Sequence, residues 1–211
     1  MNAKTNGMVK WCAAALAACW MAAASAQGVR ATDPNEFARS AVETVVKAAK
    51  ADPAARDGDV NATARVVERE FLPYTDFERT TRLAVGAPWQ DATPEQRQRM
   101  VAEFTRLLVR TYALQLTQIR NQDIRFGFKP AVLNPARDDG VVRTEVKSAD
   151  DTLQVGYRLA RTPAGWRIYD IDMMGVWLIQ LYRKQFAASL AAGGPDALIK
   201  YLADHNARFD K

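Results

Sequence analysis

Two aspartates, Asp170 and Asp172, have the spacing that comes nearest to a catalytic pair in this sequence. They lie two residues apart in a run that is predicted to be a β-strand, Trp166 to Met173, so both carboxylates share one face. Two such groups could act as general acid and base. The same spacing also fits a solvated strand face, or a salt bridge to Arg158 or Arg167, and we favour these structural interpretations.

The rest of the sequence offers few groups for chemistry. The only histidine, His205, lies in a polar run near the C-terminus, and the only cysteines are Cys12 and Cys19 near the N-terminus. Thiol and Ser-His hydrolase schemes therefore lack their parts. No G-x-S-x-G, H-E-x-x-H, G-x-G-x-x-G or P-loop motif occurs. We expect a protein that is not an enzyme, with no catalytic residue, no cofactor and no metal ligand.

One acidic stretch has the spacing of a calcium-binding loop. Asp57, Asp59, Asn61 and Glu68 match carboxylate and amide positions of an EF-hand, but Ala62 stands where glycine must make the sharp turn. An apolar stripe at helical spacing also runs through the supposed loop. We therefore interpret Asp57 to Asp59 as residues that cap helices.

Residues 1–26 are predicted to be a secretory signal peptide. Lys4 and Lys10 give it a positive start, Trp11 to Ala24 is an unbroken apolar run, and Ala24-Ser25-Ala26 fits a cleavage site before Gln27. Cleavage would remove both cysteines and lower the formal net charge from +5 to +3. We expect the mature chain, residues 27–211, to be exported, soluble and free of disulfides.

A lipid anchor is the alternative fate of this segment. Leu16-Ala17-Ala18-Cys19 resembles a bacterial lipobox, which would leave a lipidated Cys19 at the N-terminus. Trp20 to Ala24 stay apolar, however, where lipoproteins usually become polar, so we favour the soluble form. Basic residues in the mature chain are spread among acidic ones, and this distribution argues against nucleic acid as a partner.

Helical spacing and capping residues predict helices at both ends of the mature chain. A first helix begins at Asp33 and ends at Asp52-Pro53, and the longest begins at Thr93, whose Gln96 completes a capping box. Further helices are expected over about residues 60–73, 76–85 and 176–192. Gly193-Gly194-Pro195 should end the last of these and start a final helix.

Between these helices the apolar period changes from 3.6 to two, which is typical of β-strands. Alternation predicts four strands, over about residues 124–128, 142–147, 153–159 and 166–173. The connections are too short for crossover helices, so the strands should form an antiparallel meander. The predicted fold class is α+β: N-terminal helices, a four-stranded antiparallel meander sheet, and C-terminal helices packed on the sheet.

Several short motifs follow one another along residues 37–209. They are Pro73-Tyr74-Thr75-Asp76-Phe77-Glu78-Arg79, Leu83-Ala84-Val85-Gly86 with Trp89, Thr93-Pro94-Glu95-Gln96-Arg97, Gly165-Trp166-Arg167-Ile168-Tyr169-Asp170 and Tyr182-Arg183-Lys184-Gln185-Phe186. In this order and spacing the sequence resembles the MlaC/toluene-tolerance family of periplasmic phospholipid-binding proteins. It departs from the family at Trp177, where many members carry serine.

The resemblance implies that residues 27–211 form a phospholipid-binding domain around an apolar lipid cavity. It implies a soluble, monomeric periplasmic carrier that shuttles phospholipids between outer and inner membranes and so maintains outer-membrane lipid asymmetry. The implied partners are phospholipid, an inner-membrane ABC transporter with a lipid-binding ring, and an outer-membrane lipoprotein complex. Two alternatives stay open: a small periplasmic enzyme that uses Asp170 or Asp172, and a scaffold protein without a ligand.

The acyl chains are expected between the apolar faces of the longest helix and the sheet, because these faces exceed what one short helix could cover. The expected lipid-binding residues are Phe104, Leu108, Tyr112 and Leu116 on the helix, Val142, Val146, Val155 and Tyr157 on the sheet, and Trp177 and Leu181 closing one end. Ordinary core is the alternative role for each. Arg183 and Lys184 are candidates for partner docking, or simply part of a solvated face.

Overall fold

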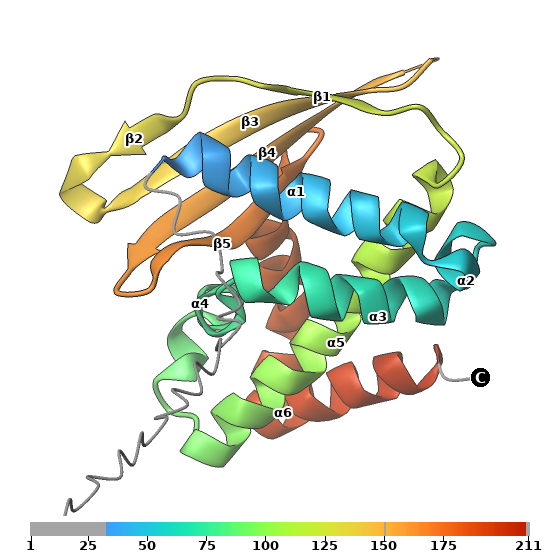
Figure 1. Ribbon diagram of the computed structural model, residues 1–211. Helices are drawn as coiled ribbons and strands as arrows, with labels where there is room; N and C mark the ends of the chain where they lie inside the picture. Colours follow the sequence, from blue (N-terminus) through green and yellow to red (C-terminus); the bar gives the residue numbers. More distant parts are fainter. Residues whose placement is uncertain (1–32, 150, 210–211) are drawn as a thin grey trace, which may run out of the picture.

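The computed structural model describes residues 33–149 and 151–209, so the predicted signal peptide and Cys19 lie outside the described residues. The chain forms an antiparallel sheet whose one face carries most of the helices (Figure 1). α1 (Pro34–Ala51) lies along the sheet, and α3 (Val60–Glu70), α5 (Pro94–Ile119) and α6 (Leu178–Ala207) lie beyond it. This arrangement leaves space between the sheet and the second row of helices to be filled by side chains.

Two shorter helices join the long ones. α2 (Pro53–Arg56) links α1 to α3, and α4 (Phe77–Val85) contacts α5, α6 and the sheet. In the part of the chain that the structure describes, no helix is both long and apolar enough to cross a membrane.

The helices begin at the predicted capping residues. The Thr93 hydroxyl accepts the Gln96 N–H at 3.2 Å, and the Gln96 side-chain oxygen accepts the Thr93 N–H at 3.0 Å, which completes the capping box of α5. A carboxylate oxygen of Asp59 accepts the N–H groups of Asn61 and Ala62, so Asp59 caps α3 as predicted. Among residues 33–149 and 151–209, no three His, Cys, Asp or Glu side chains are grouped so that they could hold a metal ion.

The sheet contains the four predicted strands and two more. Its strands are β1 (Arg125–Phe128), β2 (Val132–Asn134), β3 (Asp139–Lys147), β4 (Thr152–Thr162), β5 (Gly165–Met173) and β6 (Val176–Trp177). They follow the order β1-β3-β4-β5-β6, with β2 paired to β3 on the same edge as β1, and all pairs are antiparallel. The α+β class and the antiparallel meander are therefore confirmed, and β2 and β6 are additions.

The C-terminal helix begins at Leu178, so the predicted start at Val176 is wrong. Met174 and Gly175 have φ values of 54° and 85°, and two such residues reverse the chain in a tight turn. Val176 consequently pairs with Met173 and becomes part of β6. The predicted break at Gly193-Gly194 is confirmed, because both residues have non-helical backbone angles and kink α6.

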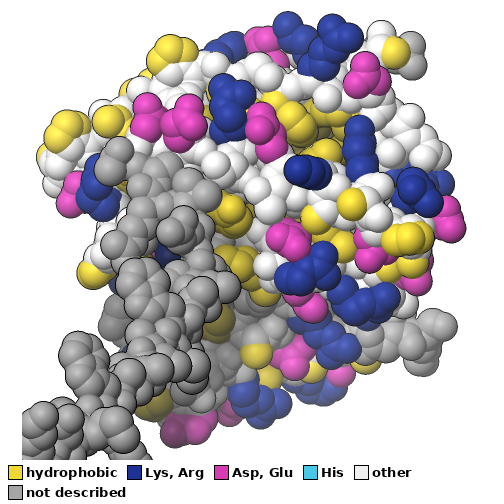
Figure 2. Space-filling view, viewed as in Figure 1, with side chains coloured by type: hydrophobic (Ala, Val, Ile, Leu, Met, Phe, Trp, Pro, Cys, Tyr) yellow, Lys and Arg dark blue, Asp and Glu magenta, His cyan; other side chains and the backbone are white. Residues whose placement is uncertain are grey.

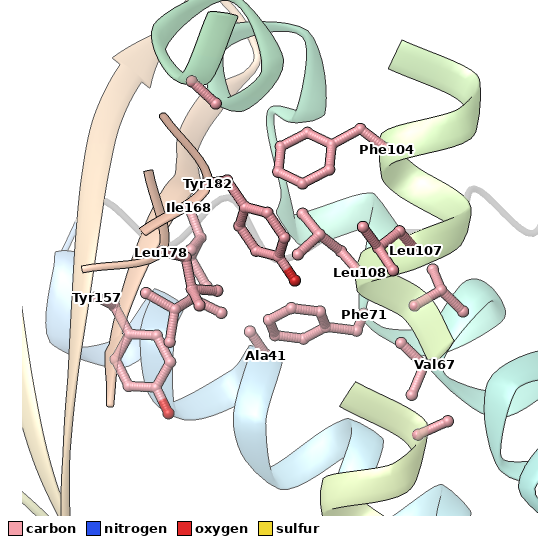
Figure 3. Packing of buried hydrophobic residues seen from close by; sticks show 14 of the residues in the cluster. Ala41, Val67, Phe71, Phe104, Leu107, Leu108, Tyr157, Ile168, Leu178 and Tyr182 are labelled. Atoms are coloured by element: carbon pink, nitrogen blue, oxygen red, sulfur yellow. The ribbon is translucent and has the colours of Figure 1, made fainter. Parts of the chain in front are cut away.

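The most tightly filled part of the molecule lies between α5 and α6. Figure 3 shows Phe104, Leu107 and Leu108 projecting from α5 toward Tyr182. The ring centroid of Phe104 is 4.8 Å from that of Tyr182 and 5.0 Å from that of Phe186, both in edge-to-face geometry. Phe104, Leu108 and Phe186 have no exposed surface, so this half of the helical layer is solid.

Candidate functional site

A cavity of about 360 Å³ lies between the sheet and the helices. α1 contributes three valines, α3 and the residue after it two side chains, and α5 four. The walls consist of Val42, Val45, Val46, Val67, Phe71, Tyr112, Gln115, Leu116, Ile119, Ile124, Phe126, Val146, Leu153, Val155, Tyr157, Ile171 and Met173. The volume is within the range of small-molecule pockets, and nearly every wall residue is apolar.

The mouth of the cavity lies where α5 ends and the β3–β4 turn begins. Gln115 and Gln122 lie on the helical side of this mouth, and Ser148 and Asp151 lie on the sheet side. Among the described residues that line the cavity, Asp151 alone carries a formal charge, and it is exposed. Figure 2 shows apolar side chains exposed between Lys and Arg side chains on one face of the molecule. The interior suits hydrocarbon, and the mouth suits a polar group.

Two tyrosines place hydroxyl groups in this apolar interior. Burial raises the pKa of Tyr112 well above its ordinary value, and the neighbouring Tyr182 raises it further. Burial likewise raises the pKa of Tyr157. Both phenols therefore stay neutral at physiological pH. The ring of Tyr112 meets that of Phe71 edge to face, with the ring centroids 5.9 Å apart, and both residues line the cavity.

Half of the residues expected to bind lipid lie on the cavity wall. These are Tyr112 and Leu116 from α5, Val146 from β3, and Val155 and Tyr157 from β4. The cross-strand register places Val146 opposite Leu153, and Val155 opposite Met173, so both pairs face the cavity. The structure thus brings together the five predicted residues that lie toward the end of α5.

The other predicted residues have different positions. Phe104, Leu108 and Val142 are fully buried in the solid core, because other side chains fill the space around them. Leu181 is exposed and does not line the cavity. Contrary to expectation, Leu181 therefore does not lie where it could close one end of the cavity.

Trp177 lies on the opposite face of the sheet. Its indole ring lies 3.8 Å from the Arg158 guanidinium carbon and close to Gly156. Gly156 and Arg158 alternate with Val155 and Tyr157 along β4, so they point away from the cavity. Trp177 consequently cannot close the cavity, and the departure from the family pattern at this position concerns the outer face.

The contribution of α1 to the cavity was not predicted from the sequence. Val42, Val45 and Val46 line the cavity from α1, and Ile119 at the end of α5 and Ile124 just before β1 also line it, although none of these was among the expected lipid-binding residues. Only the run of valines, which have low helix propensity, distinguished this part of α1 in the sequence. An apolar helical stripe by itself does not show whether a core or a cavity opposes it.

Asp170 is a structural anchor in this fold. Its Oδ2 accepts from Arg158 at 2.9 Å, and its Oδ1 accepts the N–H groups of Ile171 and Ile179 at 3.0 Å each. The Arg158 salt bridge is thereby confirmed and the solvated-face interpretation is wrong, since the side chain is fully buried. Arg167 instead donates to the Trp166 carbonyl. Burial raises the pKa of Asp170, although these partners oppose the shift.

Asp172 has a similar role at the β5–β6 turn. Its Oδ1 accepts the Gly175 N–H at 2.7 Å, and its Oδ2 lies 3.7 Å from an Arg143 nitrogen. Neither Asp170 nor Asp172 is among the residues that line the cavity. The two carboxylates thus anchor α6 and the β5–β6 turn to the sheet.

An antiparallel sheet and helices that enclose an apolar cavity with a polar mouth define a binding protein for an apolar ligand. The family described as "MlaC protein" matches residues 39–204 of the chain. This chain belongs to the MlaC family.

The sequence is also similar to named proteins of this family. The chain is 24% identical over 177 residues to the intermembrane phospholipid transport system binding protein MlaC of Haemophilus influenzae, covering 80% of this chain and 79% of that protein. It is also 24% identical over 174 residues to the toluene tolerance protein ttg2D of Pseudomonas putida, covering 80% and 78%. The names of these two relatives describe binding, transport and tolerance.

A solved structure determined with a ligand shares this fold. It is a phospholipid-binding protein from Ralstonia solanacearum, determined in complex with a phospholipid at 1.53 Å resolution. The two structures agree with a TM-score of 0.78 and 36% sequence identity, over 85% of this chain and 99% of the other. The similarity covers nearly the whole of the fold described here.

Proposed function

We propose that this protein binds the acyl chains of a phospholipid in the cavity and carries the lipid between two membranes. The observation that supports this most directly is the apolar cavity. The polar residues that line it, at its mouth, are Gln115, Gln122, Ser148 and Asp151. Tails would lie against α1, α5 and the sheet, and the head group would lie at the mouth. The Ralstonia solanacearum relative was determined with a phospholipid, which supports the same ligand class here.

The physical need for a carrier follows from the cost of exposing acyl chains. Each methylene costs about 0.8 kcal/mol to transfer into water, and two chains have about 30 of them. Spontaneous passage through an aqueous compartment is therefore very slow. A carrier needs an apolar interior and little specific chemistry, and the wall composition fits that need.

The lipid-binding residues we propose are those on the wall. They include the predicted Tyr112, Leu116, Val146, Val155 and Tyr157, together with the α1 valines. The neutral hydroxyl group of each tyrosine can donate a hydrogen bond to an ester oxygen of the lipid near the tails.

The proposed compartment is the periplasm, with residues 1–26 removed as a signal peptide and residues 27–211 as the phospholipid-binding domain. Mass spectrometry of the protein purified from the native envelope should give a mature N-terminus at Gln27. An acylated N-terminal Cys19 would contradict this proposal and make the protein membrane-tethered.

The proposed partners are an inner-membrane ABC transporter with a lipid-binding ring and an outer-membrane lipoprotein complex. The sequence has no nucleotide-binding motif, so the direction of transport must come from partners that favour the loaded or the empty state. Together these components would maintain outer-membrane lipid asymmetry, with a monomeric carrier between them.

Native mass spectrometry of the purified mature protein tests the function. A carrier should retain phospholipid in buffer and release it to the cognate inner-membrane ring without being consumed. An empty protein that turns over a substrate would instead support the enzyme alternative, in which Asp170 or Asp172 acts as acid or base. An empty protein without turnover would support the scaffold alternative.

A further inference from the structure

A second cavity, of about 390 Å³, lies on the face of the sheet opposite to the first. Its wall carries three arginines, one aspartate and several apolar side chains. The lining residues are Leu83, Arg137, Asp139, Gly140, Val141, Arg158, Tyr169, Ile179, Gln180 and Arg183. The face follows from the strand register, because Val141 pairs with Arg158, and Arg158 points away from Tyr157.

Two of the three arginines are held in place by the protein itself. Arg158 donates to Asp170 and stacks on Trp177, which leaves its remaining edge toward the cavity. Nε and Nη2 of Arg183 both donate to the Leu83 carbonyl, which ties α6 to α4. A guanidinium group has five N–H donors, so each retains donors for a ligand. Positioned guanidinium groups favour bidentate binding of carboxylates.

The cavity has a surplus of positive charge. Asp170 pairs with Arg158, but no ion pair joins Arg137 or Arg183 to a carboxylate of the described residues. Asp139 is the only carboxylate among the described residues that line the cavity. The positive surface continues beyond the cavity, where Arg79 stacks on Tyr169 with its guanidinium carbon 4.1 Å from the ring centroid.

An exposed apolar strand borders this cavity. Val132 of β2 is 72% exposed and pairs with Val141, so its side chain lies on the same face as the arginines. In the described sheet β2 pairs with β3 alone and forms an outer edge (Figure 1). Exposed apolar side chains beside Arg and Tyr are typical of protein–protein interfaces. The free edge of a sheet can also bind an extended segment of another chain.

We propose that this face docks an extended acidic segment of a partner protein. The segment would cross this face beside β2 and place its carboxylates in the cavity, against Arg137, Arg158 and Arg183. The docking surface is separate from the lipid cavity, so a partner could hold the carrier while the mouth between α5 and the β3–β4 turn stays open. This proposal does not require that lipid be bound.

A defined peptide tests the proposal on the mature protein. The probe is Ser-Glu-Val-Glu-Val-Glu-Ser, titrated into isotopically labelled protein and followed by backbone amide shifts; its control replaces every Glu with Gln. We expect shifts at Val141, Tyr169 and Ile179 with the acidic peptide alone, and weaker binding in high salt. Shifts confined to the residues of the lipid cavity, or no shifts, would overturn the proposal.

Two variants and one small anion complete the test. The double variant Arg137→Glu with Arg183→Glu should weaken peptide binding by about tenfold or more, because both residues face the cavity. Arg65→Glu, on the exposed side of α3, should leave binding unchanged. The double variant loses the Arg183 hydrogen bonds to the Leu83 carbonyl, so its melting temperature should fall slightly, and binding is compared at a temperature at which all three proteins are folded. Glutarate that binds as tightly as the peptide would indicate a small-anion site and contradict a protein-docking surface.

Discussion

The two halves of α5 have similar apolar stripes and different surroundings. In the first half Met100, Phe104 and Leu108 are fully buried, because α6 packs along them. In the second half Tyr112, Leu116 and Ile119 remain partly accessible, because the opposite wall is the sheet and α1, at a distance that leaves a cavity.

Contacts at the C-terminal end of α6 explain where the packed half stops. Asn206 donates to the Glu103 carbonyl at 2.9 Å, and the Phe209 carbonyl accepts from Arg110 at 3.1 Å. The kink at Gly193-Gly194 keeps both parts of α6 against the first half of α5. Tertiary contacts, and not the local apolar pattern, therefore separate the core from the cavity in this fold.

The largest effect on stability is expected in the packed half. Leu108→Gln places a polar amide where no surface is exposed, so it should lower the free energy of unfolding by about 3–5 kcal/mol. Urea denaturation measures this loss, and Leu108→Met is the control that keeps most of the packing. A loss below about 1 kcal/mol for Leu108→Gln would mean that this half of α5 is not solid.

The anchor of α6 on the sheet should give the next largest effect. Arg158→Gln leaves the Asp170 carboxylate buried without its cation, and we expect a loss of about 2–3 kcal/mol at neutral pH, since the Arg158 side chain is 30% exposed. The raised pKa of Asp170 should rise further.

The pH dependence of this variant has a definite sign. Below the ordinary carboxyl pKa of 3.8, Asp170 is protonated in both folded and unfolded chains, so the missing cation matters little. Stability should then be lost as pH rises through the raised folded-state pKa. Urea denaturation at acid and neutral pH checks this, and an equal loss at both would show that charge is not the cause.

A smaller effect is expected at the first turn of α5. Thr93→Ala removes the capping hydroxyl and should cost about 1 kcal/mol of stability. The amount of bound lipid should stay unchanged, because the cavity lies at the other end of α5. Thr93→Ser keeps the hydroxyl and is the control in the same denaturation experiment. Equal losses for the two variants would remove the capping explanation.

Local signals predicted the elements of this fold well. The capping box at Thr93 and Gln96 and the two-residue period of β3, β4 and β5 are properties of neighbouring residues. β2 was missed because three residues are too short to show a period. β6 was missed because its existence depends on the left-handed backbone of Met174, a non-glycine residue.

Only half of the predicted lipid-binding residues line the cavity, because local sequence patterns do not show what packs against a helix. Leu108 and Leu116 are eight residues apart on the same helical stripe, and nothing in their neighbours distinguishes them. Their roles differ because α6 covers the first and the cavity opposes the second. Trp177 was misplaced because the β5–β6 turn puts it on the outer face of the sheet.

The central claim is that the second half of α5 binds lipid and contributes little to the solid core. Leu116→Gln tests it most directly, by native mass spectrometry of the purified variant beside the wild type and Leu116→Met. We expect Leu116→Gln to lose most of its bound phospholipid while the free energy of unfolding changes by about 1 kcal/mol or less, because the side chain is half-buried at a cavity wall. Leu116→Met should keep its lipid. A Leu116→Gln protein that retains full lipid, or that unfolds as readily as Leu108→Gln, would contradict the account.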